Sequence, residues 1–368
     1  MKNRTKFVFG AVATALASTA FAGGVQLYGV IDTGVTHFTG LAGGANNTVS
    51  STGLSSGVQS GSAIGLKGSE NLSGGLTASF QVETGFCATG VSQDQTVGAT
   101  TSLAGGYCTG GGFMQRESYV GLGGSFGQIL AGRLYTAAYL HEAAVDPFQR
   151  GLTGSMGNLG LAVQRSDEAV AYLTPKVDGF HGILAYQFSV NGTLANSANP
   201  NVPRVYVVDG AYDLNGISAG VSYTHVSNIV SASAGAVANG ALALTQVYAT
   251  YTLPAVKLSA MYENQKSDFS SFNPTQKFYS LGVSVPLGSS AILASWGRRD
   301  LGVTNGQATQ LALGYTYAFS KTFNGYASYA RISNDSQTAF AVGDATDAFS
   351  GVKGQSSTGL AVGVRYQF

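Results

Sequence analysis

Large apolar residues occupy every second position along much of this chain, with small or polar residues between them. The last nine residues show the pattern clearly, because Gly363, Arg365 and Gln367 alternate with larger apolar residues. The apolar set is Leu360, Val362, Val364, Tyr366 and Phe368. Since successive side chains of a β-strand point to opposite faces, this period of two predicts a strand with one apolar face and one polar face.

The same period recurs in segments 76–83, 279–287 and 311–319. In the first of them we expect Leu76, Ala78, Phe80 and Val82 on the apolar face, and Thr77, Ser79, Gln81 and Glu83 on the polar face. Short turn signals follow such runs at 71–75, 123–127, 175–179, 215–216, 253–254, 288–290 and 319–321. Seven turns on one side of a sheet join fourteen strands, and two terminal strands raise the predicted number to sixteen.

Longer connections, rich in Gly, Ser, Asn and Thr, lie on the other side of the predicted sheet. They span 40–61, 86–112, 134–164 and 334–356. Charged residues make up only 10% of the chain, against about 25% in ordinary soluble domains. No segment after residue 22 has the roughly 18 consecutive apolar residues that a membrane-spanning helix requires.

These features together predict an all-β protein: a transmembrane antiparallel β-barrel of sixteen strands with long extracellular loops. A barrel of this size with a polar inner face has a water-filled bore. The alternation resumes after every loop, so we expect one barrel domain over residues 23–368.

The first 22 residues have the pattern of a secretory signal peptide. Lys2, Arg4 and Lys6 precede an apolar run, and Ala20-Phe21-Ala22 is a typical cleavage signal. Removing these three positive charges from the formal net charge of +1 leaves −2. The mature chain therefore lacks the positive field that nucleic-acid binding requires.

Several motifs resemble the trimeric Gram-negative porins, in particular their proteobacterial branch. They are VQLYGVIDTG at 25–34, GLKGSENLSGGL at 65–76, RESYVGL at 116–122, Gly132-Arg133 and the terminal Arg365-Tyr-Gln-Phe368. The resemblance implies a sixteen-stranded homotrimer in the outer membrane, surrounded by lipid and lipopolysaccharide, whose third loop folds into the bore. It also implies passive diffusion of small hydrophilic solutes, no cofactor, and recognition of Phe368 by the barrel-assembly machinery.

In such porins a row of basic side chains on the wall faces acids on the third loop, and the field between them steers polar solutes. Arg116, Arg133 and Arg165 match the basic row, and Lys67 shares its inward parity. Leu130 and Leu134 on the outer face would turn Arg133 inward, and Val170 and Tyr172 would turn Arg165 and Asp167 inward. Arg116 is assigned inward by resemblance. Ala63 stands where relatives carry a further arginine, so the row is one residue short.

Acidic residues of the bore are expected at Asp32, Glu83 and Asp167. In the third loop, Glu142 and Asp146 are the candidate acids, and Arg150 adds a positive charge. We predict a mild preference for anions, because three wall arginines and Arg150 outnumber the two loop acids. His141, beside Glu142, is the histidine whose titration would affect conductance.

Cys87 and Cys108 both lie in the second external loop, and a chain exported through an oxidising compartment favours a disulfide between them. Two free thiols are the alternative, and no metal site is expected. Gly123–Gly127 and Gly53–Gly57 match G-x-S-x-G, but neither lies at the strand-to-helix turn that a catalytic serine needs. We therefore expect no enzyme. The alternatives to a general porin are a barrel that displays loop 334–356 to other cells, and a porin selective for sugars or organic anions.

Overall fold

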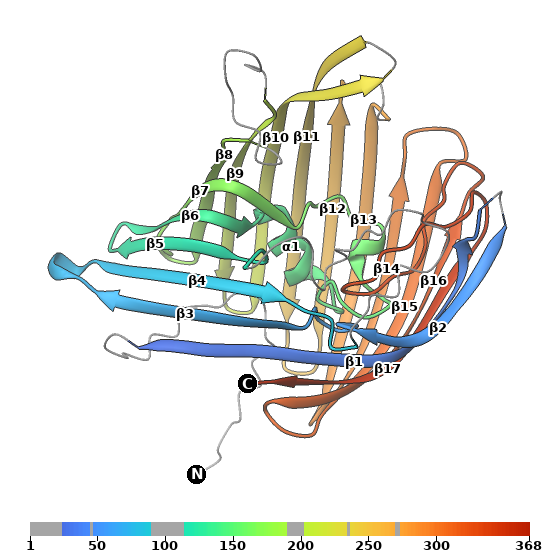
Figure 1. Ribbon diagram of the computed structural model, residues 1–368, viewed down its shortest axis with the longest axis horizontal. Coiled ribbons are helices and arrows are strands. Elements are labelled where there is room, and N and C mark those ends of the chain that lie inside the picture. Colours follow the sequence, from blue (N-terminus) through green and yellow to red (C-terminus); the bar gives the residue numbers. More distant parts are fainter. Residues whose placement is uncertain (1–23, 45–46, 90–113, 190–201, 234–235, 269–272) are drawn as a thin grey trace.

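The computed structural model describes residues 24–44, 47–89, 114–189, 202–233, 236–268 and 273–368. Strand segments β1 to β17 of this part form one antiparallel sheet (Figure 1). They are β1 (Val25–Ala42), β2 (Thr48–Ser56), β3 (Ala63–Asn71), β4 (Thr77–Gly85), β5 (Ser118–Gly124), β6 (Gly127–Tyr135), β7 (Arg165–Leu173), β8 (Phe180–Gln187), β9 (Arg204–Leu214), β10 (Ile217–Ser233), β11 (Ala236–Thr252), β12 (Lys257–Ser267), β13 (Thr275–Leu287), β14 (Ser290–Asp300), β15 (Gln307–Ala318), β16 (Phe323–Asn334) and β17 (Ser357–Gln367). Helix α1 covers Ala137–Val145, and 3-10 turns cover Ser73–Gly75 and Met156–Asn158.

The sheet closes on itself. Strand β17 pairs with β1 from Val30 to Thr39, and each later strand pairs with the next one along the chain. Segments β2 and β3 pair with successive parts of β1, so together they occupy one position of the ring. The described part of the chain is thus a closed barrel with sixteen strand positions, as the sequence predicts.

All seven predicted short turns connect neighbouring strands. The bounds of the third loop and of the last loop are also confirmed, because β6 ends at Tyr135 and β17 begins at Ser357. The prediction of a loop over 40–61 was wrong for most of its length. Strands β1 and β2 continue as a hairpin, and only segment 57–62 interrupts the second strand. Most of the predicted loop 86–112 lies outside the described residues.

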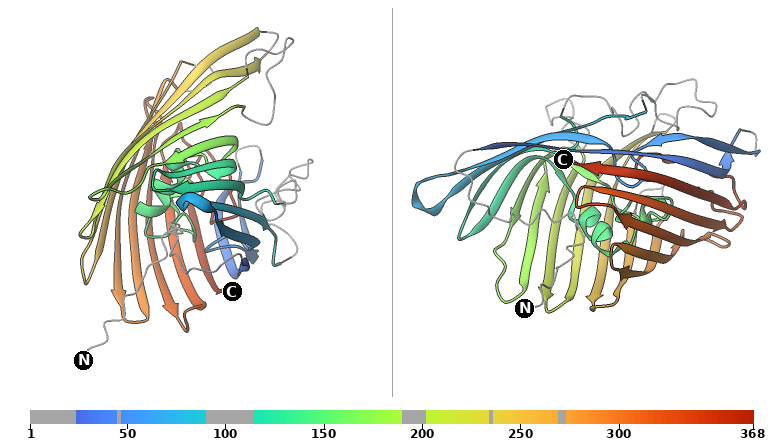
Figure 2. Two further views of the ribbon diagram at one scale, coloured as in Figure 1. Left: turned by 90° about the vertical axis from the view of Figure 1, so that its left-hand side faces the viewer. Right: turned by 90° about the horizontal axis from the view of Figure 1, so that it is seen from below.

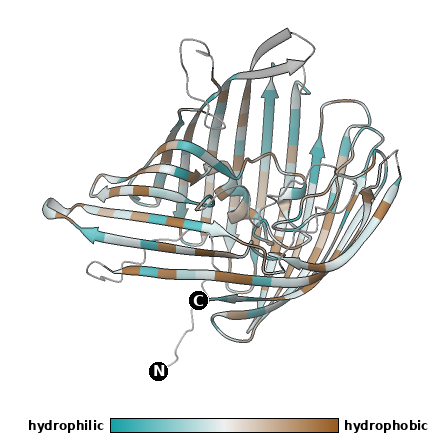
Figure 3. Ribbon diagram, in the orientation of Figure 1, coloured by the Kyte–Doolittle hydropathy of each residue, from teal (hydrophilic) through white to brown (hydrophobic). Residues whose placement is uncertain are grey.

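Apolar and polar residues alternate along the strands (Figure 3). The predicted outer residues of β15 and β17 are exposed on the barrel surface, with Leu311 60% and Val362 56% exposed. Such side chains meet lipid in a membrane-embedded barrel. None of the helices in the described ranges is both long and apolar enough to span a membrane.

The prediction that Leu130 and Leu134 face outward was wrong. Ile129 is the exposed residue, whereas Leu134 is buried against Ala169 and Leu130 packs on the same cluster. The parity of β6 is unbroken from Ile129 to Arg133, so Leu130 and Leu134 both belong to the inner face. The β-bulge in this ladder lies on β7, where Asp167 and Glu168 together stand opposite Arg133.

Helix α1 of the third loop lies inside the ring of strands in all views (Figures 1 and 2). The hydroxyl of Thr136 caps it by accepting a 3.1 Å hydrogen bond from the backbone N–H of Tyr139. The helix contacts β10, β11 and β12. The third loop therefore folds into the bore, as predicted.

The last loop also folds inward. Ala341, Val342 and Asp347 are buried, and the backbone N–H of Gly343 donates to Asn158 of the third loop at 3.0 Å. Apolar residues of both loops join one hydrophobic cluster with the inner wall, including Phe148, Val342 and Phe278. The interior is consequently part polar bore and part packed core, which strand alternation alone does not reveal.

Candidate functional site

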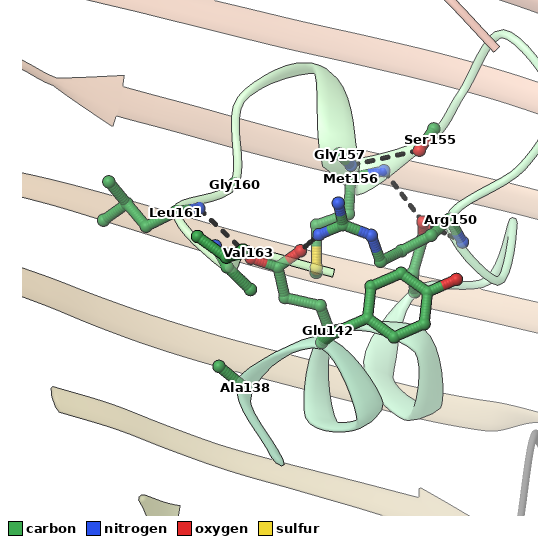
Figure 4. A network of polar contacts seen from close by, with 12 residues as sticks. Ala138, Glu142, Arg150, Ser155, Met156, Gly157, Gly160, Leu161 and Val163 are labelled. Atoms are coloured by element: carbon green, nitrogen blue, oxygen red, sulfur yellow. Dashed lines mark hydrogen bonds and ion pairs between the residues drawn. The ribbon is translucent and has the colours of Figure 1, made fainter. Parts of the chain in front are cut away.

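The third loop is organised around a buried carboxylate. Glu142 on α1 has no exposed surface and forms an ion pair with Arg150. It also accepts hydrogen bonds from the backbone N–H groups of Leu161 (3.1 Å) and Ala162 (2.9 Å). Figure 4 shows Glu142 directed at Arg150 and Leu161 from one turn of the helix. The charge of Glu142 is thus neutralised inside the loop.

Asp146, the second predicted acid, binds backbone groups of the same loop. Its carboxylate accepts hydrogen bonds from the N–H groups of Phe148 (3.0 Å), Arg150 (2.9 Å) and Met156 (2.8 Å). Burial raises the pKa of Asp146 to about 6, against the pull of these three donors. Neither predicted acid therefore offers a free negative charge to the bore.

Charged and amide side chains of the opposite wall hold the third loop in place. Arg299 of β14 donates to the carbonyl oxygens of Leu159 (2.7 Å) and Gly160 (3.0 Å). Glu263 of β12 is fully buried and accepts from the N–H of Leu161 at 2.9 Å. Neither Arg299 nor Glu263 was predicted from the sequence as a contact of the loop. Both residues lie at inward positions of strands with regular alternation, and that position was the signal in the sequence that could have revealed them.

Two more contacts complete the attachment of the third loop to the wall. Gln310 of β15 donates to the carbonyl oxygens of Gly154 (3.0 Å) and Ser155 (3.1 Å). Lys257 of β12 donates to the carbonyl of Ala144 at 2.7 Å, near the C-terminus of α1. A cation at this end of a helix is favoured by the helix dipole.

Two of the predicted wall arginines come together. Arg116 forms an ion pair with Glu83 of β4 and lies 3.5 Å from the hydroxyl of Tyr135. Arg165, at the start of β7, donates to the same hydroxyl at 3.0 Å and to Gln164 at 2.7 Å. Tyr135 thus joins the two guanidinium groups, a role that the sequence analysis did not assign.

Arg133 does not join this pair in the structure. Its guanidinium forms an ion pair with Asp167 of β7. In the ladder with β5, Arg133 lies opposite Ser118, which shares the outer face with Val120, 63% exposed. Parity counted from Leu130 and Leu134 gave the wrong face, because both leucines face inward and Arg133 has the outer parity of Ile129.

Other predicted residues of the bore have structural contacts. Lys67 lies opposite Gln81 in the ladder of β3 and β4, and its ammonium is 5.1 Å from the centre of the Tyr28 ring. Asp32 is fully buried and accepts hydrogen bonds from the N–H groups of Gln59 (2.9 Å) and Ser60 (2.8 Å) and from the Tyr326 hydroxyl (2.7 Å).

The residues match a model of one family, the Gram-negative porins, over 10–337. The chain belongs to the Gram-negative porin family. It is 28% identical to an outer membrane porin protein of Bordetella pertussis and 27% identical to outer membrane porin protein 32 of Delftia acidovorans, with 94% of both chains covered in each comparison. The chain is accordingly an outer-membrane diffusion porin of a Gram-negative bacterium.

Solved porins share the fold. An anion-selective porin from Comamonas acidovorans superposes with a TM-score of 0.75 at 24% identity, covering 94% of this chain and 100% of that one. OmpT of Vibrio cholerae gives a TM-score of 0.65 at 17% identity, covering 95% of this chain and 99% of the other. These likenesses describe the barrel and its strand order.

His141 connects α1 of the porin to the wall. Its Nε2 lies 3.2 Å from a carboxylate oxygen of Asp209 on β9, and its ring lies 4.4 Å from the ring of Tyr248. Burial lowers the pKa of His141 to about 4, so the imidazole is neutral near pH 7. This histidine lies on the side of α1 that faces β9 and β11, and none of its contacts in the described part of the chain is with Arg116 or Arg165.

The porin has a cavity of about 310 Å³ between its third and last loops. Its lining includes Tyr139, Arg150, Gln164, Asp344 and Asp347. Asp344 and Asp347 belong to the last loop, and burial together with the charge of Asp347 raises the pKa of Asp344 well above its usual range. Neither acid was predicted from the sequence, because this loop was expected outside the barrel.

The C-terminal residue of the porin, Phe368, pairs with the first strand, β1. Its backbone exchanges hydrogen bonds of 3.0 and 3.1 Å with Gly29, and its ring fills the space where a side chain at Gly29 would lie.

Cys87 is not a free cysteine in the described part of the chain. Cys108 and the predicted signal peptide lie outside the described residues.

Proposed function

We propose that this porin conducts small hydrophilic solutes and ions without catalysis and with a mild preference for anions. The observation that carries the preference is the position of Arg165, which shares the hydroxyl of Tyr135 with Arg116. Among the described residues, Arg165 has no carboxylate within ion-pair distance, whereas Arg116 is paired with Glu83. A positive charge without a direct counter-charge beside a narrow passage attracts anions.

The balance of the third loop supports the same conclusion. Glu142 is compensated by Arg150, and Asp146 by three backbone N–H groups. The loop therefore contributes little net negative potential to oppose Arg165. The anion-selective porin from Comamonas acidovorans has the same barrel fold, which is consistent with this assignment.

The absence of catalysis is inferred from the setting of the serine motifs. Gly123–Gly127 spans the tight turn between β5 and β6. Gly53–Gly57 continues along and just past β2. A nucleophile elbow requires a strand followed by a helix, and neither segment has one.

We further propose a homotrimer embedded in outer-membrane lipid and lipopolysaccharide, exported by cleavage after residue 22. Phe368 is proposed as the signal read by the barrel-assembly machinery, and Cys87 and Cys108 as a disulfide pair. Selectivity for sugars or organic anions remains the second candidate within the same pore. The buried last loop disfavours a barrel that mainly displays loop 334–356.

Reversal potentials in a KCl gradient test the proposal. The wild-type trimer in planar bilayers should prefer chloride, and a variant with Arg116→Ser and Arg165→Ser together should lose most of that preference. Arg331→Ser is the matched control, because Arg331 is an exposed arginine on the same face as Tyr329, outside the bore. A cation preference in the wild type, or an unchanged ratio in the double variant, would refute the proposal.

A further inference from the structure

Tyr135 lies between two positively charged side chains at the end of β6. Its hydroxyl accepts a hydrogen bond from Arg165 at 3.0 Å and lies 3.5 Å from Nη2 of Arg116. Two guanidinium groups repel each other unless acceptors or acids lie between them. The Tyr135 hydroxyl is one such group, and Glu83, paired with Arg116, is another.

The ring of Tyr135 supplies a second kind of contact. The guanidinium of Arg165 lies 4.7 Å from the centre of this ring. Arginine stacks on aromatic faces because the face of the ring carries negative charge density. Arg165 is therefore fixed in two ways, by the hydroxyl in one direction and by the ring face in another.

A second tyrosine extends the arrangement to the third loop. The rings of Tyr135 and Tyr139 are 4.9 Å apart and inclined by 9°, so they stack. The guanidinium of Arg150 lies 4.8 Å from the centre of the Tyr139 ring. A continuous series of ring contacts thus runs from Arg165 on the wall, through both tyrosines, to Arg150 on the loop.

This series borders a cavity inside the barrel. Tyr139, Arg150 and Gln164 line the cavity of about 310 Å³ between the two inward-folded loops. Gln164 accepts a hydrogen bond from Arg165 at 2.7 Å, which places the guanidinium of Arg165 beside the cavity. The buried Nε of Arg165 has no hydrogen-bond partner among the described residues.

We propose that Tyr135 is a positioning residue of the anion filter, holding Arg165 and Arg116 together and aligning them with Arg150 through Tyr139. An arginine side chain has several rotatable bonds, and stacking restricts them. Without the tyrosine, the charge of Arg165 would spread over many positions and the field at the passage would weaken. This inference rests on the proposed function, because it assumes that Arg165 attracts anions.

Two variants separate the hydroxyl from the ring. Tyr135→Phe keeps the stacking surface and removes the shared acceptor, whereas Tyr135→Leu removes both. Tyr329→Phe is the matched control, because Tyr329 is 46% exposed on the outer face. All variants are measured as refolded trimers, by reversal potential in a KCl gradient and by single-channel conductance.

We expect the chloride-to-potassium permeability ratio to fall at least twofold in Tyr135→Phe and further in Tyr135→Leu, while Tyr329→Phe keeps the wild-type ratio. Combining Arg165→Ser with Tyr135→Leu should lower the ratio by less than the two separate effects together. A merely structural effect of Tyr135 would instead be additive. If Tyr135→Leu does not fold, Tyr135→Phe with and without Arg165→Ser decides the question.

The outcomes distinguish this inference from the proposed function. If Arg165→Ser lowers the ratio and Tyr135→Phe leaves it unchanged, the positioning role is wrong and the anion filter stands. If the variant with Arg116→Ser and Arg165→Ser leaves the ratio unchanged, the filter itself is wrong.

Discussion

The wall formed by β5 to β7 and the wall formed by β12 to β15 both carry inward-facing charged residues, with different consequences. On the second wall, Arg299 and Glu263 bind the backbone of the third loop directly. On the first wall, Arg165 contacts only neutral groups among its described partners, Tyr135 and Gln164. Inward-facing arginines on the two walls therefore differ in role. Where backbone groups of the loop lie opposite, the arginine attaches the loop; where none do, it is left to select solutes.

The largest effect is expected from breaking the attachment inside the third loop. Glu142→Ala removes the partner of Arg150 and the acceptor for Leu161 and Ala162. Because a buried charge is left unpaired, we expect destabilisation of about 3–5 kcal/mol. Urea unfolding of the trimer in detergent measures it, with Glu70→Ala as an exposed control at the end of β3. Equal stability of the two variants would contradict the buried role of Glu142.

The next effect concerns His141, which attaches α1 to Asp209. Its pKa in the folded porin is about 4, below the ordinary value of roughly 6.5. Between pH 6.5 and 4 the unfolded chain therefore binds a proton that the folded porin does not bind. Stability should fall as pH falls through this window, by up to about 3 kcal/mol.

Asp146 acts in the opposite direction over part of that window. Its pKa is raised to about 6, so the folded porin takes up its proton first and gains stability as pH falls. The difference between wild type and His141→Gln isolates the histidine. We expect the free energy of unfolding of His141→Gln to change less than that of the wild type as pH falls toward 4. Parallel curves for the two proteins would exclude a contribution from His141.

Arg299 is expected to give a smaller loss of stability. Arg299→Ala removes hydrogen bonds to Leu159, Gly160 and Gln276. Since part of the cost is recovered by water in the bore, we expect about 2 kcal/mol and larger current fluctuations in single channels. Arg298→Ala, on the neighbouring position of β14, is the matched control. A quiet channel with wild-type stability would show that the third loop does not need this anchor.

The smallest change in stability is expected where the change in selectivity is greatest. Arg165→Ser should lower the free energy of unfolding by about 1 kcal/mol, less than Arg299→Ala, yet reduce the preference for chloride. Arg299→Ala should show the reverse. If Arg165→Ser destabilises the trimer as strongly as Arg299→Ala, the distinction between the two walls fails.

The barrel itself was predictable from the sequence. Turns such as Asn215–Gly216 and the alternation in 311–319 specify strand ends and faces, because a period of two has one geometric meaning. Parity fails where the starting face is misjudged: Leu130 and Leu134 were taken as outer residues, and this choice misplaced Arg133.

The third and last loops were predictable in extent and not in partners. The last loop was bounded correctly at 334–356, yet its inward course depends on contacts such as Gly343 with Asn158, some 185 residues apart. Residue type alone does not determine which backbone group of the loop will contact Glu263 or Gln310. The pairing of Tyr135 with two arginines was missed for the same reason.

Asp32 lies where the two ends of the barrel meet, and this position has a consequence for folding. Its partner Tyr326 is 294 residues away on β16, and Gln59 and Ser60 come from the interruption between β2 and β3. Contacts of such sequence separation form late, because they require closure of very long loops. An open precursor keeps this carboxylate hydrated, and only the joined ring supplies all of its donors. Dehydration of Asp32 and closure of the ring should therefore occur as one cooperative event, with few half-closed species along the way.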